Sequence, residues 1–227
     1  MKTVINFLRQ LKENNNREWF NAHKGMYIDA QARFNAVVQD ILNGIMNFDE
    51  SVTGLTVKDC IYRIYRDVRF SKDKSPYKTH MGAYMCPGGK KSGFSGYYFH
   101  VGVGGTGYPE GHMLAVGDYM CEPKVLQVIR EDIAFDGDYF QSILDGAGEK
   151  FVLDDSNKLK NVPKGFDKDS KWAEYLKYKV FCIYQEPSDS VMTSKNCAEY
   201  IIQECKKAKP FLDFINRAVQ YVKEGNE

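Results

Sequence analysis

Long apolar runs are missing from this chain of 227 residues. No stretch approaches the roughly 20 consecutive apolar residues of a membrane-spanning helix. The first segment, MKTVINFLRQLKENN, turns polar too early for a secretory signal peptide. We therefore expect a protein without a membrane partner that stays in the cytoplasm.

Low-complexity tracts and linkers rich in Gly, Pro or Ser are missing as well. With 43% hydrophobic residues the chain can bury a substantial core, so we predict a single domain over residues 1–227. Within it we expect a helical N-terminal part at 1–48, a strand and hairpin block with a basic loop at 55–120, and mixed helices and strands at 121–227.

Paired metal ligands are absent too. The six cysteines lie scattered, without the paired spacing of a zinc site. We interpret them as reduced, small hydrophobic side chains. The four histidines are dispersed, with no His-x-x-His pair and no helix motif that pairs His with Glu. We predict no metal site.

Neither glycine-rich stretch has the form of a nucleotide-binding loop. One Gly-Lys pair is followed by Lys91 instead of Ser or Thr, and no glycine stands at position 84. Gly102, Gly104 and Gly107 match a Gly-x-Gly-x-x-Gly string, but Tyr-Pro-Glu-Gly follows where a helix should begin. We interpret both sets as turn glycines and predict no cofactor.

Excess charge of either sign is also absent, because the net charge is only +1. This balance argues against non-specific nucleic-acid binding by the whole surface. Positive charge is concentrated in one run from Arg63 to His80, RIYRDVRFSKDKSPYKTH, with six Lys or Arg against two Asp. Since arginine suits bidentate capture of a carboxylate or phosphate, the run predicts an anion-binding site, without identifying a reaction.

The first half of this run, together with the residues before it (KDCIYRIYRDVRF), alternates as a β-strand does. One face is mostly apolar and carries Tyr62, Ile64, Arg66, Val68 and Phe70. The other face presents Arg63, Asp67 and Arg69, so two guanidiniums would flank a carboxylate that orients them. Because Arg66 falls on the apolar face, it needs a partner there.

The second half of the run changes character at Ser75-Pro76, since proline lacks an amide hydrogen and restricts the residue before it. We predict a basic loop at the end of the strand. Its side chains Lys74, Tyr77 and Lys78 would close over an anion bound beside the arginines.

A second predicted strand, Tyr97 to Val103, has Tyr98, His100 and Gly102 on its polar face. If this strand joins the same sheet, Tyr98 and His100 would lie near the arginines. Nearby positive charge would favour the neutral imidazole, and so a general-base role for His100. The alternative is that His100 is a satisfied structural residue, which is the commoner role of a lone histidine on a strand.

Helical spacing dominates both ends of the chain and strand patterns its middle. We predict helices near 3–14 and 123–133, a helical turn after Asn16 followed by a longer helix that carries Tyr27 to Ile45, and two closing helices that divide at Pro210. Strand patterns occur near 81–86 and 97–103 and within GHMLAVGDYM and KVFCIYQE, with a shorter one in FVLDD. This order predicts an α+β domain whose mainly antiparallel sheet packs against helices on one face.

Four segments together resemble a bacterial family, also found in fungi, known as domain of unknown function 2461: FLRQLKENNNREWFNAHK, RIYRDVRFSKDKSPYKTH, YYFHVGVGG and LKNVPKGFD. The resemblance covers nearly the whole chain and implies a single-domain cytoplasmic protein, with no assigned reaction, substrate or cofactor. The positions that match the family signature are Arg63, Arg66, Asp67, Arg69, Phe70, Lys74 and Tyr77. Three residues in and just after the segment NNREWF either reach the same site or serve as capping and surface residues: Asn15, Arg17 and His23.

Three hypotheses follow for the basic run. In the first, it lines a pocket for a phosphorylated or carboxylated small molecule, with Arg63 and Arg69 as clamps. In the second, it binds single-stranded nucleic acid, because Tyr62, Tyr65, Phe70 and Tyr77 interleave with its cations as in a stacking platform. In the third, it is an ion-pair network without a ligand. The sequence leaves the oligomeric state open.

Overall fold

The computed structural model describes residues 1–104 and 111–225 of the chain. Residues 105–110, which include Gly107 of the predicted Gly-x-Gly-x-x-Gly string, are not among them. The longer helices are α1 (Lys2–Glu13), α2 (Arg17–Ala22), α3 (Lys24–Met46), α5 (Pro123–Phe135), α6 (Gly137–Ala147) and α9 (Cys197–Glu224). The shorter ones are a 3-10 turn (Glu50–Val52), α4 (Val57–Cys60), α7 (Ala173–Leu176) and α8 (Asp189–Thr193).

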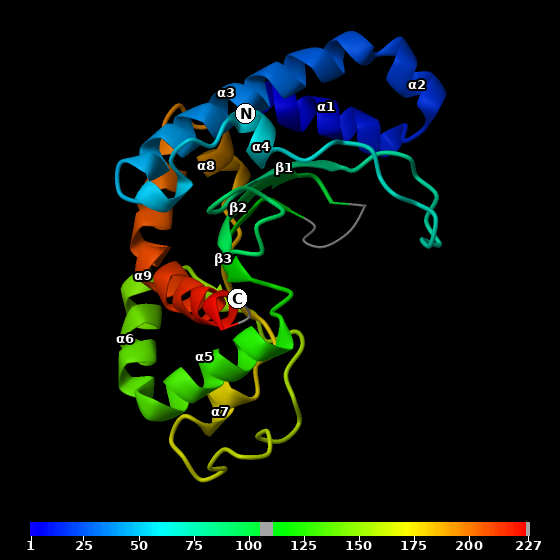
Figure 1. Cartoon of the computed structure of the whole chain (residues 1–227). Coiled ribbons are helices and arrows are strands. Elements are labelled where there is room, and N and C mark those ends of the chain that lie inside the picture. Colours follow the sequence, from blue (N-terminus) through cyan, green and yellow to red (C-terminus); the bar gives the residue numbers. More distant parts are fainter. Residues whose placement is uncertain (105–110, 226–227) are drawn as a thin grey trace.

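One antiparallel sheet organises the fold (Figure 1). Its strands are β1 (His80–Met85), β2 (Gly96–Gly102), β3 (Met113–Asp118), β4 (Val152–Leu153) and β5 (Phe181–Gln185). They lie in the order β1-β2-β3-β5-β4, and every neighbouring pair is antiparallel. The prediction of a single α+β domain, with a mainly antiparallel sheet packed against helices on one face, is confirmed.

The helix-covered face of the sheet holds the core, because alternate residues of each strand point toward the helices. On β2 these residues are Tyr97, Phe99 and Val101, all without exposed surface. The ring of Phe34 from α3 stacks on Phe99 at 6.0 Å. Helices α1, α3 and α9 all contact the sheet, so helices from both ends of the chain close over the same apolar surface.

The opposite face of the sheet carries a row of tyrosines and is called the tyrosine face below. Cross-strand pairing aligns Tyr84 of β1 with Tyr98 of β2, Tyr98 with Ala115 of β3, and Ala115 with Tyr184 of β5. The neighbouring row is Gly82, His100 and Met113. Residues directly opposite one another point to the same side, so the two rows form one surface.

The strand predicted over KDCIYRIYRDVRF was wrong. Its first part forms the short helix α4, because the Asp59 carboxylate accepts hydrogen bonds from the N–H and the hydroxyl of Thr56 and caps the turn. The rest is extended but pairs with the sheet only at isolated bridges, Ile61 with Ala83 and Tyr65 with Tyr77. Phe70, placed on an apolar face by the strand pattern, is 96% exposed.

A bulge explains why this pairing fails to become a ladder. Between the two bridges, residues 62–64 lie opposite residues 78–82, so three residues on one side face five on the other. Extra residues on one strand interrupt the regular hydrogen bonds. Beyond the bulge the chain leaves the sheet as the basic loop, residues 66–75, which projects away from the helices in Figure 1 (blue-green).

The predicted division of the closing helices at Pro210 was also wrong. Helix α9 runs through this proline from Cys197 to Glu224. Its buried residues on both sides of Pro210, such as Ile201 and Phe214, pack into the same core. Tertiary packing on both sides therefore outweighs the one backbone hydrogen bond that proline removes.

Within residues 1–104 and 111–225, no helix combines the length and the apolar composition that crossing a bilayer requires.

Candidate functional site

Four of the predicted anion-binding residues hold the basic loop together. Arg66 pairs with Asp73 at 2.5 Å and donates to the carbonyl of Ser75 at 2.9 Å, which supplies the partner that its position required. Asp67 pairs with Arg69 at 2.6 Å. The Lys74 ammonium donates to the carbonyl of Val68 at 2.9 Å. These cations are thus engaged within the loop itself.

These contacts lower the pKa values of the two carboxyl groups of the loop, Asp67 and Asp73. Hydrogen bonds from Arg69 hold the pKa of Asp67 at about 2. Hydrogen bonds from Ser75, and then from Arg66, hold the pKa of Asp73 at about 2. Asp67 therefore orients Arg69, whereas Arg63, which the sequence also placed beside Asp67, has no ion pair in the described part of the chain.

Tyr77 belongs to the core and not to the loop surface. It is 3% exposed, and its ring stacks on Phe20 at 4.0 Å. The side chain of Asn15 donates to the Tyr77 carbonyl at 2.9 Å and accepts from its N–H at 3.1 Å, as a neighbouring strand would. Asn15 thereby joins the N-terminal helices to the basic run. The aromatic residues proposed as a stacking platform are therefore divided between core and solvent, because Tyr77 is buried whereas Phe70 is exposed.

Lys78 lies at the end of the tyrosine face, in a different environment from the loop cations. Its ammonium lies 5.4 Å from the centre of the Tyr62 ring and has no hydrogen bond or carboxylate partner among the described residues. Burial, and then the charge of Arg63, lower its pKa. Lys90 reaches the same ring at 5.6 Å but also donates to the carbonyl of Ile61 at 3.0 Å. Lys78 is the less satisfied of the two.

Tyr98 and His100 share a hydrogen-bond chain on the tyrosine face. The Tyr98 hydroxyl lies 2.9 Å from Nδ1 of His100, and Nε2 of His100 lies 2.8 Å from the carbonyl oxygen of Gly111. The Tyr98 ring meets Tyr62 edge-on at 6.3 Å. Four residues therefore form one continuous group: Tyr62, Lys78, Tyr98 and His100. The sequence predicted the last three as neighbours in one site but did not include Tyr62 with them.

His100 is fully buried, and His80 stacks on it at 4.9 Å. Burial, reinforced by His80, lowers the pKa of His100 to about 3. Burial, reinforced by Lys78 and Arg66, lowers the pKa of His80 to about 4. Both rings are neutral near pH 7. Since each nitrogen of His100 has a partner within the protein, no lone pair of that ring is left for a substrate, and we assign it a positioning role.

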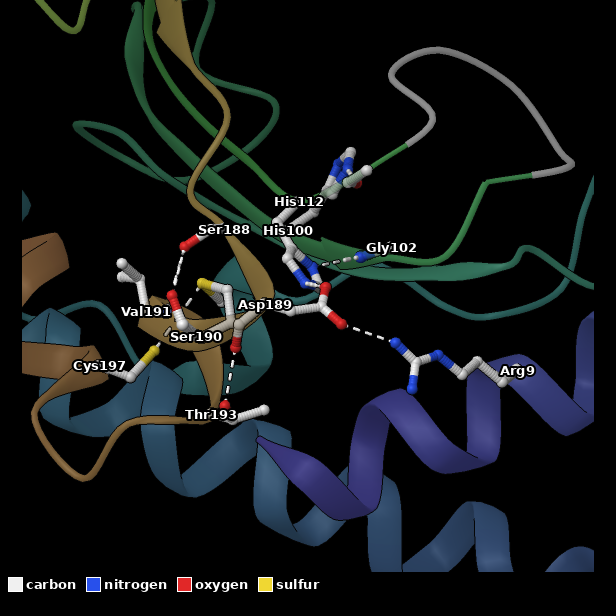
Figure 2. A network of polar contacts seen from close by, with 12 residues as sticks. Arg9, His100, Gly102, His112, Ser188, Asp189, Ser190, Val191, Thr193 and Cys197 are labelled. Carbon is white, nitrogen blue, oxygen red and sulfur yellow. Dashed lines mark hydrogen bonds and ion pairs between the residues drawn. The ribbon is translucent and has the colours of Figure 1, made fainter.

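A second polar cluster lies in a cleft of about 640 Å³ between α1 and the start of α8, and the sequence did not predict it. Figure 2 shows His112 between Gly102 and Asp189. Nδ1 of His112 accepts from the N–H of Gly102 at 3.3 Å, and Nε2 donates to Asp189 at 2.9 Å. Arg9 pairs with the other oxygen of Asp189 at 2.6 Å.

This cluster joins three segments that are far apart in the chain, and each of its central groups already has a protein partner. His112 is 4% exposed, so its ring is enclosed as well as bonded. No local motif marks Arg9, His112 or Asp189 in the sequence. Because Arg9, His112 and Asp189 are all paired with one another or with Gly102, the cluster fits a structural tie between α1, β2 and α8 better than a ligand site.

Comparison with known proteins gives the family. Residues 3–214 match the family model described as conserved hypothetical protein (DUF2461). The chain belongs to this family. The family predicted from the sequence is thus confirmed, and the DUF2461 match spans both the tyrosine face and the Arg9–Asp189 cleft. No curated protein and no solved structure gives a significant match to this DUF2461 chain. The family description names no reaction, substrate or cofactor.

Proposed function

We propose that this protein binds a small molecule with a phosphate or carboxylate group at the cationic end of the tyrosine face, beside Lys78 and Arg63. The observation that carries the proposal is the Lys78 ammonium, which is partly buried and without an anionic partner in the described part of the chain. A charge taken out of water without a counter-charge destabilises the fold. A bound anion would remove that cost.

The neighbours of Lys78 favour an anion over a cation. Arg63 is exposed and unpaired in the described residues, and its charge acts on Lys78. His80 and His100 are neutral, so neither ring adds a positive charge that would repel Lys78. The ring of Tyr62 gives the ligand an apolar wall. Arg66, Arg69 and Lys74 support the proposal less than the sequence suggested, because their contacts within the loop compete with a ligand.

The small number of exposed aromatic rings beside Lys78 and Arg63 favours a small molecule over a nucleic-acid strand. Single-stranded binding uses several exposed rings along a charged groove. Here Tyr77 is buried, Tyr62 packs against Tyr98, and Phe70 lies on the basic loop. The ion-pair hypothesis accounts for the loop, residues 66–75, but leaves Lys78 and Arg63 without a role.

Thermal-shift and calorimetric titrations test the proposal, with inorganic phosphate, sugar phosphates, short carboxylates and a short oligonucleotide as probes. A ligand of the folded form raises the Tm by mass action. We expect one or more small anions to raise the Tm of the native protein and of Lys72→Met, an exposed matched control, and to bind at least about tenfold more weakly to Lys78→Met. Equal binding to both variants, or a response to the oligonucleotide alone, would overturn the proposal.

A further inference from the structure

The hydrogen-bond chain on the tyrosine face fixes where its protons lie. A carbonyl oxygen only accepts hydrogen bonds, so the contact between His100 Nε2 and the Gly111 carbonyl places a proton on Nε2. The ring is buried and neutral, so it carries one proton only. Nδ1 is therefore bare and must accept the hydrogen of the Tyr98 hydroxyl, 2.9 Å away.

The Tyr98 hydroxyl consequently has no hydrogen left to give. A phenol has one donor and two acceptor lone pairs, and here the single donor points at His100. Toward the tyrosine face, the Tyr98 oxygen can only accept. The tautomer of His100, set by the Gly111 carbonyl, thus decides the chemistry that Tyr98 offers to a ligand.

Gly82 brings this oxygen to the site of the proposed anion. A Cβ at Gly82 would lie 3.0 Å from the Tyr98 hydroxyl oxygen, so the missing side chain lets the Tyr98 ring lie across β1. The Tyr62 amide pairs with the Gly82 carbonyl at 2.9 Å. The Tyr98 ring is 6.3 Å and the Lys78 ammonium 5.4 Å from the same Tyr62 ring, so both groups border the ring against which the proposed ligand would lie.

We propose that the ligand carries a hydroxyl or amino hydrogen as well as its anionic group, and that Tyr98 selects it by accepting that hydrogen. The ligand class is then a hydroxylated or aminated anion, such as a hydroxy acid, an amino acid or a polyol phosphate. This inference rests on the proposed anion site at Lys78. It adds a specificity residue, Tyr98, and a positioning residue, His100, which acts only through Tyr98.

Matched probe pairs test the inference by calorimetry: glycerol 3-phosphate against propyl phosphate, and lactate against propionate. We expect the hydroxylated member of at least one pair to bind about tenfold more tightly to the native protein, since a lost polar contact leaves the Tyr98 oxygen unpaired. The preference should vanish in Tyr98→Phe and persist in Tyr184→Phe, a control from the same row of the sheet. Equal affinity within both pairs, or a preference that survives Tyr98→Phe, would overturn it.

Two further measurements separate the possible failures. Sulfate carries no hydrogen at pH 7, so its Lys78-dependent binding should survive Tyr98→Phe; this also shows that the variant folds. Absence of sulfate binding to the native protein would refute the anion site itself, whereas sulfate binding without a hydroxyl preference in the matched pairs would refute only the role of Tyr98. Nitrogen-15 NMR of His100 should show a protonated Nε2 and a bare Nδ1, and the reverse tautomer would contradict the assignment directly.

Discussion

Acid should unfold this protein partly through His100, and the size of the effect follows from its burial. The ring is fully enclosed, and its pKa is about 3, against an ordinary value of 6.5. Because the pKa is lower in the folded state, the unfolded chain binds the extra proton first as pH falls. The stability contributed by the neutral ring is complete above pH 6.5 and is lost progressively below it, down to about pH 3.

Proton linkage gives the magnitude between pH 7 and pH 5. Over that interval, one histidine that stays neutral when folded loses about 2 kcal/mol of unfolding free energy. His80 adds to the loss with the same sign, because its pKa is about 4. Asp118 acts in the opposite direction, since burial raises the pKa of its carboxyl. The native protein and a variant changed only at position 100 share His80 and Asp118, so the contributions of these two residues cancel when the two proteins are compared.

Urea unfolding of the native protein and of His100→Gln at pH 7 and pH 5 measures the effect, followed by the fluorescence of Trp19 and Trp172. Glutamine keeps a donor and an acceptor at this position but does not titrate. We expect acidification to cost the variant about 2 kcal/mol less than the native protein, whatever their difference at pH 7. If both lose the same free energy, His100 does not remain neutral in the fold and the reasoning fails.

Two predictions concern stability at other positions. Asn15→Ala should lower the free energy of unfolding by about 1–3 kcal/mol, because both backbone groups of Tyr77 lose their partner; chemical denaturation checks this against Asn14→Ala, and equal losses would contradict it. Gly117→Ala should be more damaging, about 3 kcal/mol or more, since its φ is +117° and a Cβ would collide with the Phe181 carbonyl oxygen. Gly146→Ala in α6, where a Cβ meets nothing within 4 Å, is the control and should be neutral or stabilising by up to about 1 kcal/mol, so a harmless Gly117→Ala would refute the clash.

The strands were predictable where alternation reflects burial on one face. Tyr97, Phe99 and Val101 repeat at period two because each meets the helices, and the structure has β2 there. The same period at residues 61–70 led to the wrong prediction of a strand, because alternation alone does not show whether a neighbouring strand stays in register. The pairing there is broken by the bulge, and Asp67 bonds to Arg69 two residues away.

The site was predictable in composition more than in arrangement. The sequence placed Arg63, Lys78, Tyr98 and His100 in one region, and the last three share the tyrosine face. It predicted that Arg66 needs a partner but not that the partner is Asp73, because that contact depends on how the loop closes. Clusters built from distant segments, such as Arg9 with Asp189, leave no local pattern at all. Local periodicity reports which face a residue takes, whereas its partner depends on the complete fold.

The bulge beside β1 also constrains how the length of this segment can change during evolution. Three residues face five there, a surplus of two. Side chains alternate between the two faces with a period of two, so an even surplus leaves Lys78 on the tyrosine face and Tyr77 on the core side. Loss of one residue from the longer side would turn Lys78 toward the core and Tyr77 away from it. Loss of two residues would remove the bulge and leave both side chains on their present faces. We expect insertions and deletions among relatives to occur here in even numbers.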